Sequence, residues 1–184
     1  SDRAVSTPDP FRPTIRPRRL RQSPAMRRLV AETRLSVDDV VAPLFVREGI
    51  SEPVPISSLP GVSQHSMDSL LREAESLVSG GVPGLLLFGV PESKDESGSG
   101  AWDPEGIVQV ALRRLQAEFG TSTVIMADLC LDEYTSHGHC GLLDANGNVD
   151  NDKTLALYQK VAVAQAEAGA RVCAPSGMMD GQVA

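Results

Sequence analysis

Short apolar runs alternate along the chain with segments in which apolar residues recur at helical spacing. The runs favour buried strands because they are continuous rather than alternating with polar residues. The predicted strands are 40–46, 84–90, 122–131 and 171–176. The segments between them predict helices that begin at Met67, at Pro104 with Asp103 as the N-cap, and at Asn151. Strand and helix in regular alternation predict a parallel sheet of the α/β class.

The spacing of the strands narrows this fold class. Strands that recur at roughly 40-residue intervals are typical of the (β/α)8 TIM barrel, which needs about 250 residues. The sequence therefore predicts about the first four β/α units of such a barrel. Half a barrel leaves strand edges unpaired, so either the chain continues or a partner supplies the remainder. An open four-stranded α/β domain is the alternative.

The N-terminal segment has a different composition. Residues 1–22 are rich in proline, arginine and serine and predict an extended N-terminal arm, and residues 23–184 predict the barrel domain. A short helix is expected to begin after Ser23, with Pro24 in its first turn. Residues 1–34 carry a balance of +6 against −13 for the remainder. With one aromatic residue and many prolines, the arm favours docking on an acidic neighbouring subunit over binding nucleic acid or acting as a targeting peptide.

Composition excludes several classes of protein. No apolar run approaches the roughly 18 residues of a membrane span, and the arm itself contains no apolar signal segment. Three cysteines are an odd number, which argues against a disulfide framework and for a reducing compartment. We therefore expect a cytoplasmic protein that binds neither membrane nor nucleic acid.

The segment ADLCLDEYTSHGHCG, residues 127–141, carries most of the candidate chemistry. If the strand persists through it, Cys130 and Asp132 point to one face, and Cys140 returns after a turn. Two thiolates and a carboxylate are three protein ligands, the number found in catalytic zinc sites with an open position. His137 and His139 can ligate a metal or orient a ligand. A polar catalytic loop without metal, or a redox-active thiol pair, remains open.

A series of eight motifs resembles one family, porphobilinogen synthase, also called 5-aminolevulinate dehydratase. The motifs are RPRRLR, PLFVREG, PISSLPGV, KDESGSGAW, DLCLDEYTSHGHCG, NDKTL, AEAGA and APSGMMDG, in family order from about Arg16 to the end. The resemblance implies a TIM-barrel lyase that condenses two molecules of 5-aminolevulinate to porphobilinogen with loss of two waters, a step toward haem. The motif series argues against an alternative, an unrelated metal-assisted aldolase-like barrel.

The resemblance also implies roles for individual residues. Cys130, Asp132 and Cys140 match the zinc ligands of the zinc-dependent branch, with a carboxylate where that branch has its middle cysteine. A harder ligand should weaken zinc and ease competition by magnesium. Two further residues match catalytic positions, Asp128 near the substrate amine and Ser176 near the Schiff-base carbon. His139 would orient the metal ligands without binding the metal itself.

The match to the family has gaps. Gly177 and Gln182 stand where the family often has an aspartate and an arginine. The two Schiff-base lysines are expected beyond residue 184, since Lys94, Lys153 and Lys160 do not match them. Family members assemble through an N-terminal arm, which implies a homo-octamer. The alternative function is a truncated, inactive homologue that acts as a metal-binding or assembly module.

Overall fold

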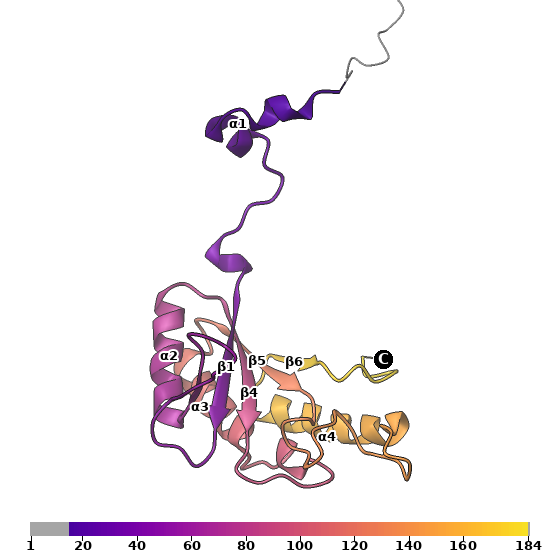
Figure 1. Cartoon of the computed structure of the whole chain (residues 1–184). Coiled ribbons are helices and arrows are strands. Elements are labelled where there is room, and N and C mark those ends of the chain that lie inside the picture. The colour runs from indigo at the N-terminus through magenta and orange to yellow at the C-terminus, as the bar shows by residue number, and fades with distance from the viewer. Residues whose placement is uncertain (1–14, 184) are drawn as a thin grey trace, which may run out of the picture. The chain divides into compact units, whose positions relative to one another are not determined.

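The structure is a computed structural model that describes residues 15–183. The chain divides into two compact units, with the boundary between Ser36 and Val37. In its described part the first unit holds η1 (Pro17–Arg21) and α1 (Pro24–Leu29), and none of the residues in these two helices is buried (Figure 1). Oγ of Ser23 accepts the backbone N–H of Met26 at 3.1 Å, which confirms the predicted cap.

The second unit is built on a six-stranded sheet in the order β2-β3-β1-β4-β5-β6. Neighbouring strands are parallel except for the antiparallel pair β2 and β3. The strands are β1 (Val41–Arg47), β2 (Val54–Pro55), β3 (Ser63–His65), β4 (Gly84–Val90), β5 (Val124–Leu129) and β6 (Val172–Pro175). The four predicted strands are confirmed, but the third is shorter than predicted, and the short β2 and β3 were not predicted.

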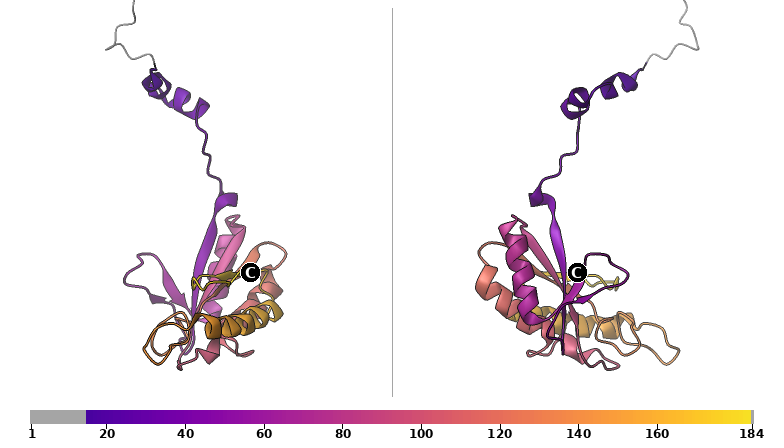
Figure 2. Two further views of the ribbon diagram at one scale, coloured as in Figure 1. Left: turned by 90° about the vertical axis from the view of Figure 1, so that its right-hand side faces the viewer. Right: turned by 60° about the vertical axis from the view of Figure 1, so that its left-hand side comes forward.

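Helices connect the parallel strands. They are α2 (Met67–Ser79), α3 (Ile107–Phe119) and α4 (Asn151–Glu167), with the short η2 (Val37–Asp39) and η3 (Ser99–Ala101). Helix α2 contacts β1, α3 contacts β4 and β5, and α4 contacts β5 and β6. Figure 2 shows the helices around the strands from two further sides.

The predicted start of α3 at Pro104, with Asp103 as its N-cap, is wrong. Oδ1 of Asp103 accepts the N–H of Glu105, and the Asp103 carbonyl accepts the N–H of Gly106. These bonds close a tight turn, so the helix begins only at Ile107, with Gly106 in an extended conformation as its N-cap. The acidic residue is used for a turn because its side chain competes for nearby backbone donors.

The two faces of the sheet differ in burial. Leu85 and Leu87 are fully buried in the core that the helices cover, and Ile125 on β5 is their neighbour. Leu86 and Phe88 alternate with them and are half-buried on the opposite face, where Phe88 stacks on Phe45 at 5.0 Å between ring centroids. Leu86 and Phe88 on this opposite face line the same cavity as the polar groups at the carboxyl ends of the strands.

Candidate metal centre

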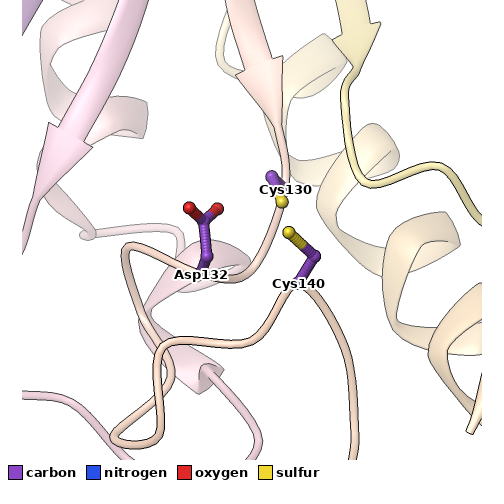
Figure 3. Close-up of side chains that lie close together, drawn as sticks. All are labelled: Cys130, Asp132 and Cys140. Carbon is purple, nitrogen blue, oxygen red and sulfur yellow. The ribbon is translucent and has the colours of Figure 1, made fainter. Parts of the chain in front are cut away.

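Cys130, Asp132 and Cys140 come together in the loop after β5. One possible ligand atom from each lies within 4.8 Å of the others, and Figure 3 shows the three side chains facing a common space. Cys130 is buried and the other two are half-buried. The convergence was predicted, but its reason was wrong. The strand ends at Leu129, so the loop rather than strand alternation brings the side chains together.

Buried hydrogen bonds hold the shape of this loop. The N–H of Thr135 donates to the Leu131 carbonyl at 2.8 Å, and its hydroxyl donates to the His139 carbonyl at 2.8 Å. Between them Gly138 has a φ of 72°, a conformation that glycine adopts without strain. Thr135, only 1% exposed, thus fixes the turn that returns the chain to Cys140.

Helix α4 supports the same loop from behind. The Tyr158 hydroxyl lies 2.8 Å from the Cys140 carbonyl oxygen, to which it donates, and 3.7 Å from Sγ of Cys130. Two helical turns further along the same face, Nε2 of Gln165 donates to the Asp128 carbonyl at 2.6 Å. Sequence reasoning missed both residues, because nothing in the helical pattern distinguishes a tyrosine or glutamine that faces a site from one that packs in a core.

The donor set fits a divalent metal. Thiolate sulfur and carboxylate oxygen are both zinc ligands, and three protein ligands leave a position open. Ligand atoms around one tetrahedral zinc lie roughly 3.3–3.8 Å apart for bonds of about 2.0–2.3 Å, which is inside the 4.8 Å spread found here. Burial raises the pKa of the Cys130 thiol, and a bound cation has the opposite effect. The three residues can therefore hold a metal ion.

Asp128 and Ser176 lie beside this group, at the ends of β5 and β6. The Ser176 hydroxyl donates to Oδ1 of Asp128 at 2.7 Å. Both residues line a cavity of about 460 Å³ together with Cys130, Asp132 and Cys140. Burial raises the pKa of Asp128, and the Asp132 carboxylate adds to this, whereas the Ser176 bond opposes it.

Glu133 lines the same cavity and was not singled out by the sequence. Burial, with the neighbouring carboxylates of Asp132 and Asp128, raises its pKa to about 8. Its Oε2 is buried without a hydrogen-bond partner among the described residues. Its place between two motif ligands was the only signal available, and a glutamate there is equally typical of a solvated loop.

A second loop braces the site from the β4 side. The Asp95 carboxylate accepts the backbone N–H and hydroxyl groups of Ser97 and Ser99. The Asp95 backbone pairs with the metal-centre loop, because its N–H donates to the Tyr134 carbonyl and its carbonyl accepts from Ser136. These bonds link the two loops at the carboxyl ends of the strands.

Other candidates lie outside the group of three. The His139 ring is exposed and packs near His137, with 5.5 Å between ring centroids. Lys94 is exposed. The Cys173 thiol donates to the Ala162 carbonyl at 3.7 Å, and burial raises its pKa. None of these four side chains belongs to the Cys130–Asp132–Cys140 group.

Together, the fold and the site define an α/β protein with a mostly parallel sheet, a candidate metal centre and a polar cavity at the carboxyl ends of the strands. A sequence profile of the delta-aminolevulinic acid dehydratase family matches residues 14–184. The chain belongs to the delta-aminolevulinic acid dehydratase family.

Curated relatives and a solved structure agree with this assignment. The delta-aminolevulinic acid dehydratase of Streptomyces coelicolor is 58% identical over 173 residues, 93% of this chain and 52% of the relative. That of Mycobacterium tuberculosis is 60% identical over 174 residues, 94% of this chain and 53% of the relative. The chain thus spans about half the length of these relatives.

One solved structure that matches is delta-aminolevulinic acid dehydratase from Toxoplasma gondii in complex with its reaction product porphobilinogen. It has a TM-score of 0.84 at 38% identity and covers 91% of this chain and 48% of that one. Across residues 15–183, no helix has the length and apolar character needed to cross a membrane.

Proposed function

We propose that this protein is a porphobilinogen synthase, a lyase that condenses two molecules of 5-aminolevulinate to porphobilinogen with loss of two waters. The observation that carries the proposal is the shared cavity, lined by Asp128, Ser176 and the Cys130–Asp132–Cys140 group. The related T. gondii enzyme with bound porphobilinogen supports the same substrate class.

The arrangement of the sheet supports a barrel. From β1 through β4 and β5 to β6, parallel strands follow one another in chain order without reversal. Right-handed crossovers in one direction place every helix on the same face, as in a barrel, whereas doubly wound sheets reverse direction. We propose that these strands form the first four β/α units of a (β/α)8 barrel, whose interior Phe45 and Phe88 face.

The metal we propose for the centre is zinc, bound by Cys130, Asp132 and Cys140. The carboxylate makes the set harder than three thiolates, which weakens zinc and eases replacement by magnesium or manganese. When bound, such an ion acts as a Lewis acid that polarises a substrate oxygen. His139, in the same turn as Cys140, would orient the ligand loop.

Asp128 and Ser176 would act on the substrate directly. A half-buried carboxylate with a raised pKa is suited to accept a proton from a substrate ammonium and return it later. The Ser176 hydroxyl holds that carboxylate by a hydrogen bond, and both residues line the cavity. In this proposal Asp128 positions and deprotonates the amine, and Ser176 hydrogen-bonds near the reacting carbon.

We further propose that the arm, residues 1–22, docks on a neighbouring subunit and builds a homo-octamer. Its described residues 15–22 include four arginines and are mostly exposed, which suits contact with an acidic surface. Three free cysteines, two of them in one ligand group, support a reducing, cytoplasmic setting.

The test uses a protein that contains this sequence and has the full length of the curated relatives. After chelation it is incubated with 5-aminolevulinate, with and without Zn²⁺, and porphobilinogen is measured. We expect metal-dependent product, lost in the Cys130→Ser, Cys140→Ser double variant. Reduction with borohydride should also trap a substrate adduct, seen by intact mass. A folded protein that binds zinc but gives neither product nor adduct would instead be the alternative, a metal-binding module without catalysis.

A further inference from the structure

The hydroxyl of Tyr158 reaches both cysteines of the metal centre from outside the motif. Tyr158 lies on α4, is 4% exposed, and contacts the Cys140 carbonyl oxygen at 2.8 Å and Sγ of Cys130 at 3.7 Å. Its single proton can be donated to only one of them, and the shorter contact is a hydrogen bond of ordinary length. The longer contact is within the range of sulfur acceptors.

The two contacts of the Tyr158 hydroxyl act on proposed ligands that are ten residues apart in the sequence. By holding the carbonyl of Cys140, the Tyr158 hydroxyl fixes the backbone that carries the Cys140 sulfur. The Tyr158 hydroxyl oxygen also limits the movement of the Cys130 sulfur. Groups that hydrogen-bond to ligand residues in this way orient the ligands and raise metal affinity. Tyr158 is itself anchored by α4, which packs against β5 and β6.

A second observation, at Gly177, supports the same role independently. A Cβ at this position would overlap the Tyr158 hydroxyl oxygen and lie 2.7 Å from Cζ. Gly177 does not have a positive φ, so its backbone alone would accept another residue. The glycine is therefore required by the tyrosine ring above it, and position 177 is small because the hydroxyl must reach the cysteines.

We propose that Tyr158 is a positioning residue of the metal centre, which holds Cys130 and Cys140 in ligating geometry, and that Gly177 is a glycine in order to admit its hydroxyl. The inference rests on the proposed metal binding by the Cys130–Asp132–Cys140 group. It concerns the pair Tyr158 and Gly177, which are separate from the ligands themselves.

The test is a titration of the metal-free, full-length protein with Co²⁺, followed by its sulfur-to-cobalt charge-transfer absorption. Tyr158→Phe keeps the ring and removes only the hydroxyl. We expect its Co²⁺ affinity to fall about 10–100-fold, the usual cost of losing such a support, with a shifted absorption band. The matched control is Thr123→Val, which also removes a buried hydroxyl, one that donates to the Val82 carbonyl in a segment without a ligand. We expect it to bind Co²⁺ within about twofold of wild type, the margin of independent sites.

A double-mutant cycle tests the role of Gly177. Gly177→Ala should weaken Co²⁺ binding in the wild-type background, because the new methyl group displaces the tyrosine. In a Tyr158→Leu background the space is free, so the same substitution should change affinity by about twofold or less. An equal loss in both backgrounds overturns the link between the two residues.

Two further outcomes separate this inference from the proposed metal site. A wild-type protein without a charge-transfer band overturns the thiolate site, and the inference with it. A wild-type protein that binds Co²⁺, with Tyr158→Phe unchanged or matched by the loss in Thr123→Val, overturns the positioning role alone.

Discussion

The hydroxyl of Ser176 donates a 2.7 Å hydrogen bond to Oδ1 of Asp128 and so joins the ends of two neighbouring parallel strands. The two residues are 48 positions apart in the sequence, and only the pairing of β5 with β6 makes them neighbours. The bond fixes one oxygen of a carboxylate that lines the cavity, and this is the feature on which the proposed role of Asp128 rests.

Ser176→Ala should lower kcat/KM by about ten- to a hundredfold, because a hydrogen bond to a charged group contributes about 1.5–3 kcal/mol. The measurement is the steady-state rate of porphobilinogen formation by the full-length protein. Ser79→Ala, at the exposed end of α2, is the matched control and should retain the wild-type rate. An unchanged rate in Ser176→Ala would show that the bond only links the strands.

Asp132→Cys should tighten zinc binding by completing a three-thiolate set. After dialysis against a mild chelator, we expect the variant to keep close to stoichiometric zinc, whereas wild type loses most of it. Metal content is measured by elemental analysis. Asp68→Cys, which adds a thiol on the exposed first turn of α2, should behave as wild type. Wild-type protein that resists the chelator as well as Asp132→Cys contradicts the weakened site.

Thr135→Val should destabilise the protein by about 1–3 kcal/mol, since it leaves the His139 carbonyl without its buried donor. It should also weaken metal binding, because the turn leading to Cys140 loosens. Thr123→Val is the control: Thr123 is also buried, and its hydroxyl donates to the Val82 carbonyl at 3.2 Å, in a segment that carries no ligand. The melting temperature should fall in both variants, whereas zinc affinity should fall in Thr135→Val alone. Equal affinities would contradict a role for the turn.

Elements with a long and distinctive local pattern could be predicted from the sequence. The continuous apolar run of β4 was predicted at its observed bounds because seven such residues between turn signals have few alternatives. The two- and three-residue strands β2 and β3 were missed because nothing so short, in a proline-rich segment, has a pattern. The start of α3 was misplaced because Asp103 fits a helix cap and a turn equally well.

Prediction of the metal centre was divided in the same way. Cys130, Asp132 and Cys140 were singled out by their side-chain chemistry and by the family resemblance, and the structure brings them together, while metal binding stays a prediction. Tyr158 and Gln165 contribute through contacts with residues 18 to 37 positions away. Such contacts depend on how α4 packs against the sheet, and tertiary packing of this kind leaves no local trace in a sequence.

Asp95 supplies a prediction about pH. Hydrogen bonds from the hydroxyl and backbone N–H groups of Ser99 and Ser97 hold the pKa of its carboxyl well below its usual range. A group whose pKa is lowered on folding stabilises the protein above its unfolded pKa, about 3.9 for aspartate, and this contribution is lost as the pH falls toward the folded pKa. The carboxylate is exposed, so solvent screening keeps its contribution near the about 1 kcal/mol of an ordinary cap.

Asp95→Ala should therefore lower Tm by roughly 2–4 °C at neutral pH, the shift expected from about 1 kcal/mol in a domain of this size. The difference in Tm between wild type and variant should stay constant above about pH 5 and shrink as the pH falls below about 4. Calorimetry across this range measures it, with Asp68→Ala as an exposed aspartate outside the two loops. A difference that is the same at pH 3 and pH 7 would mean that the loop draws its stability from the backbone pairing of Asp95 with the metal-centre loop, and not from the carboxylate.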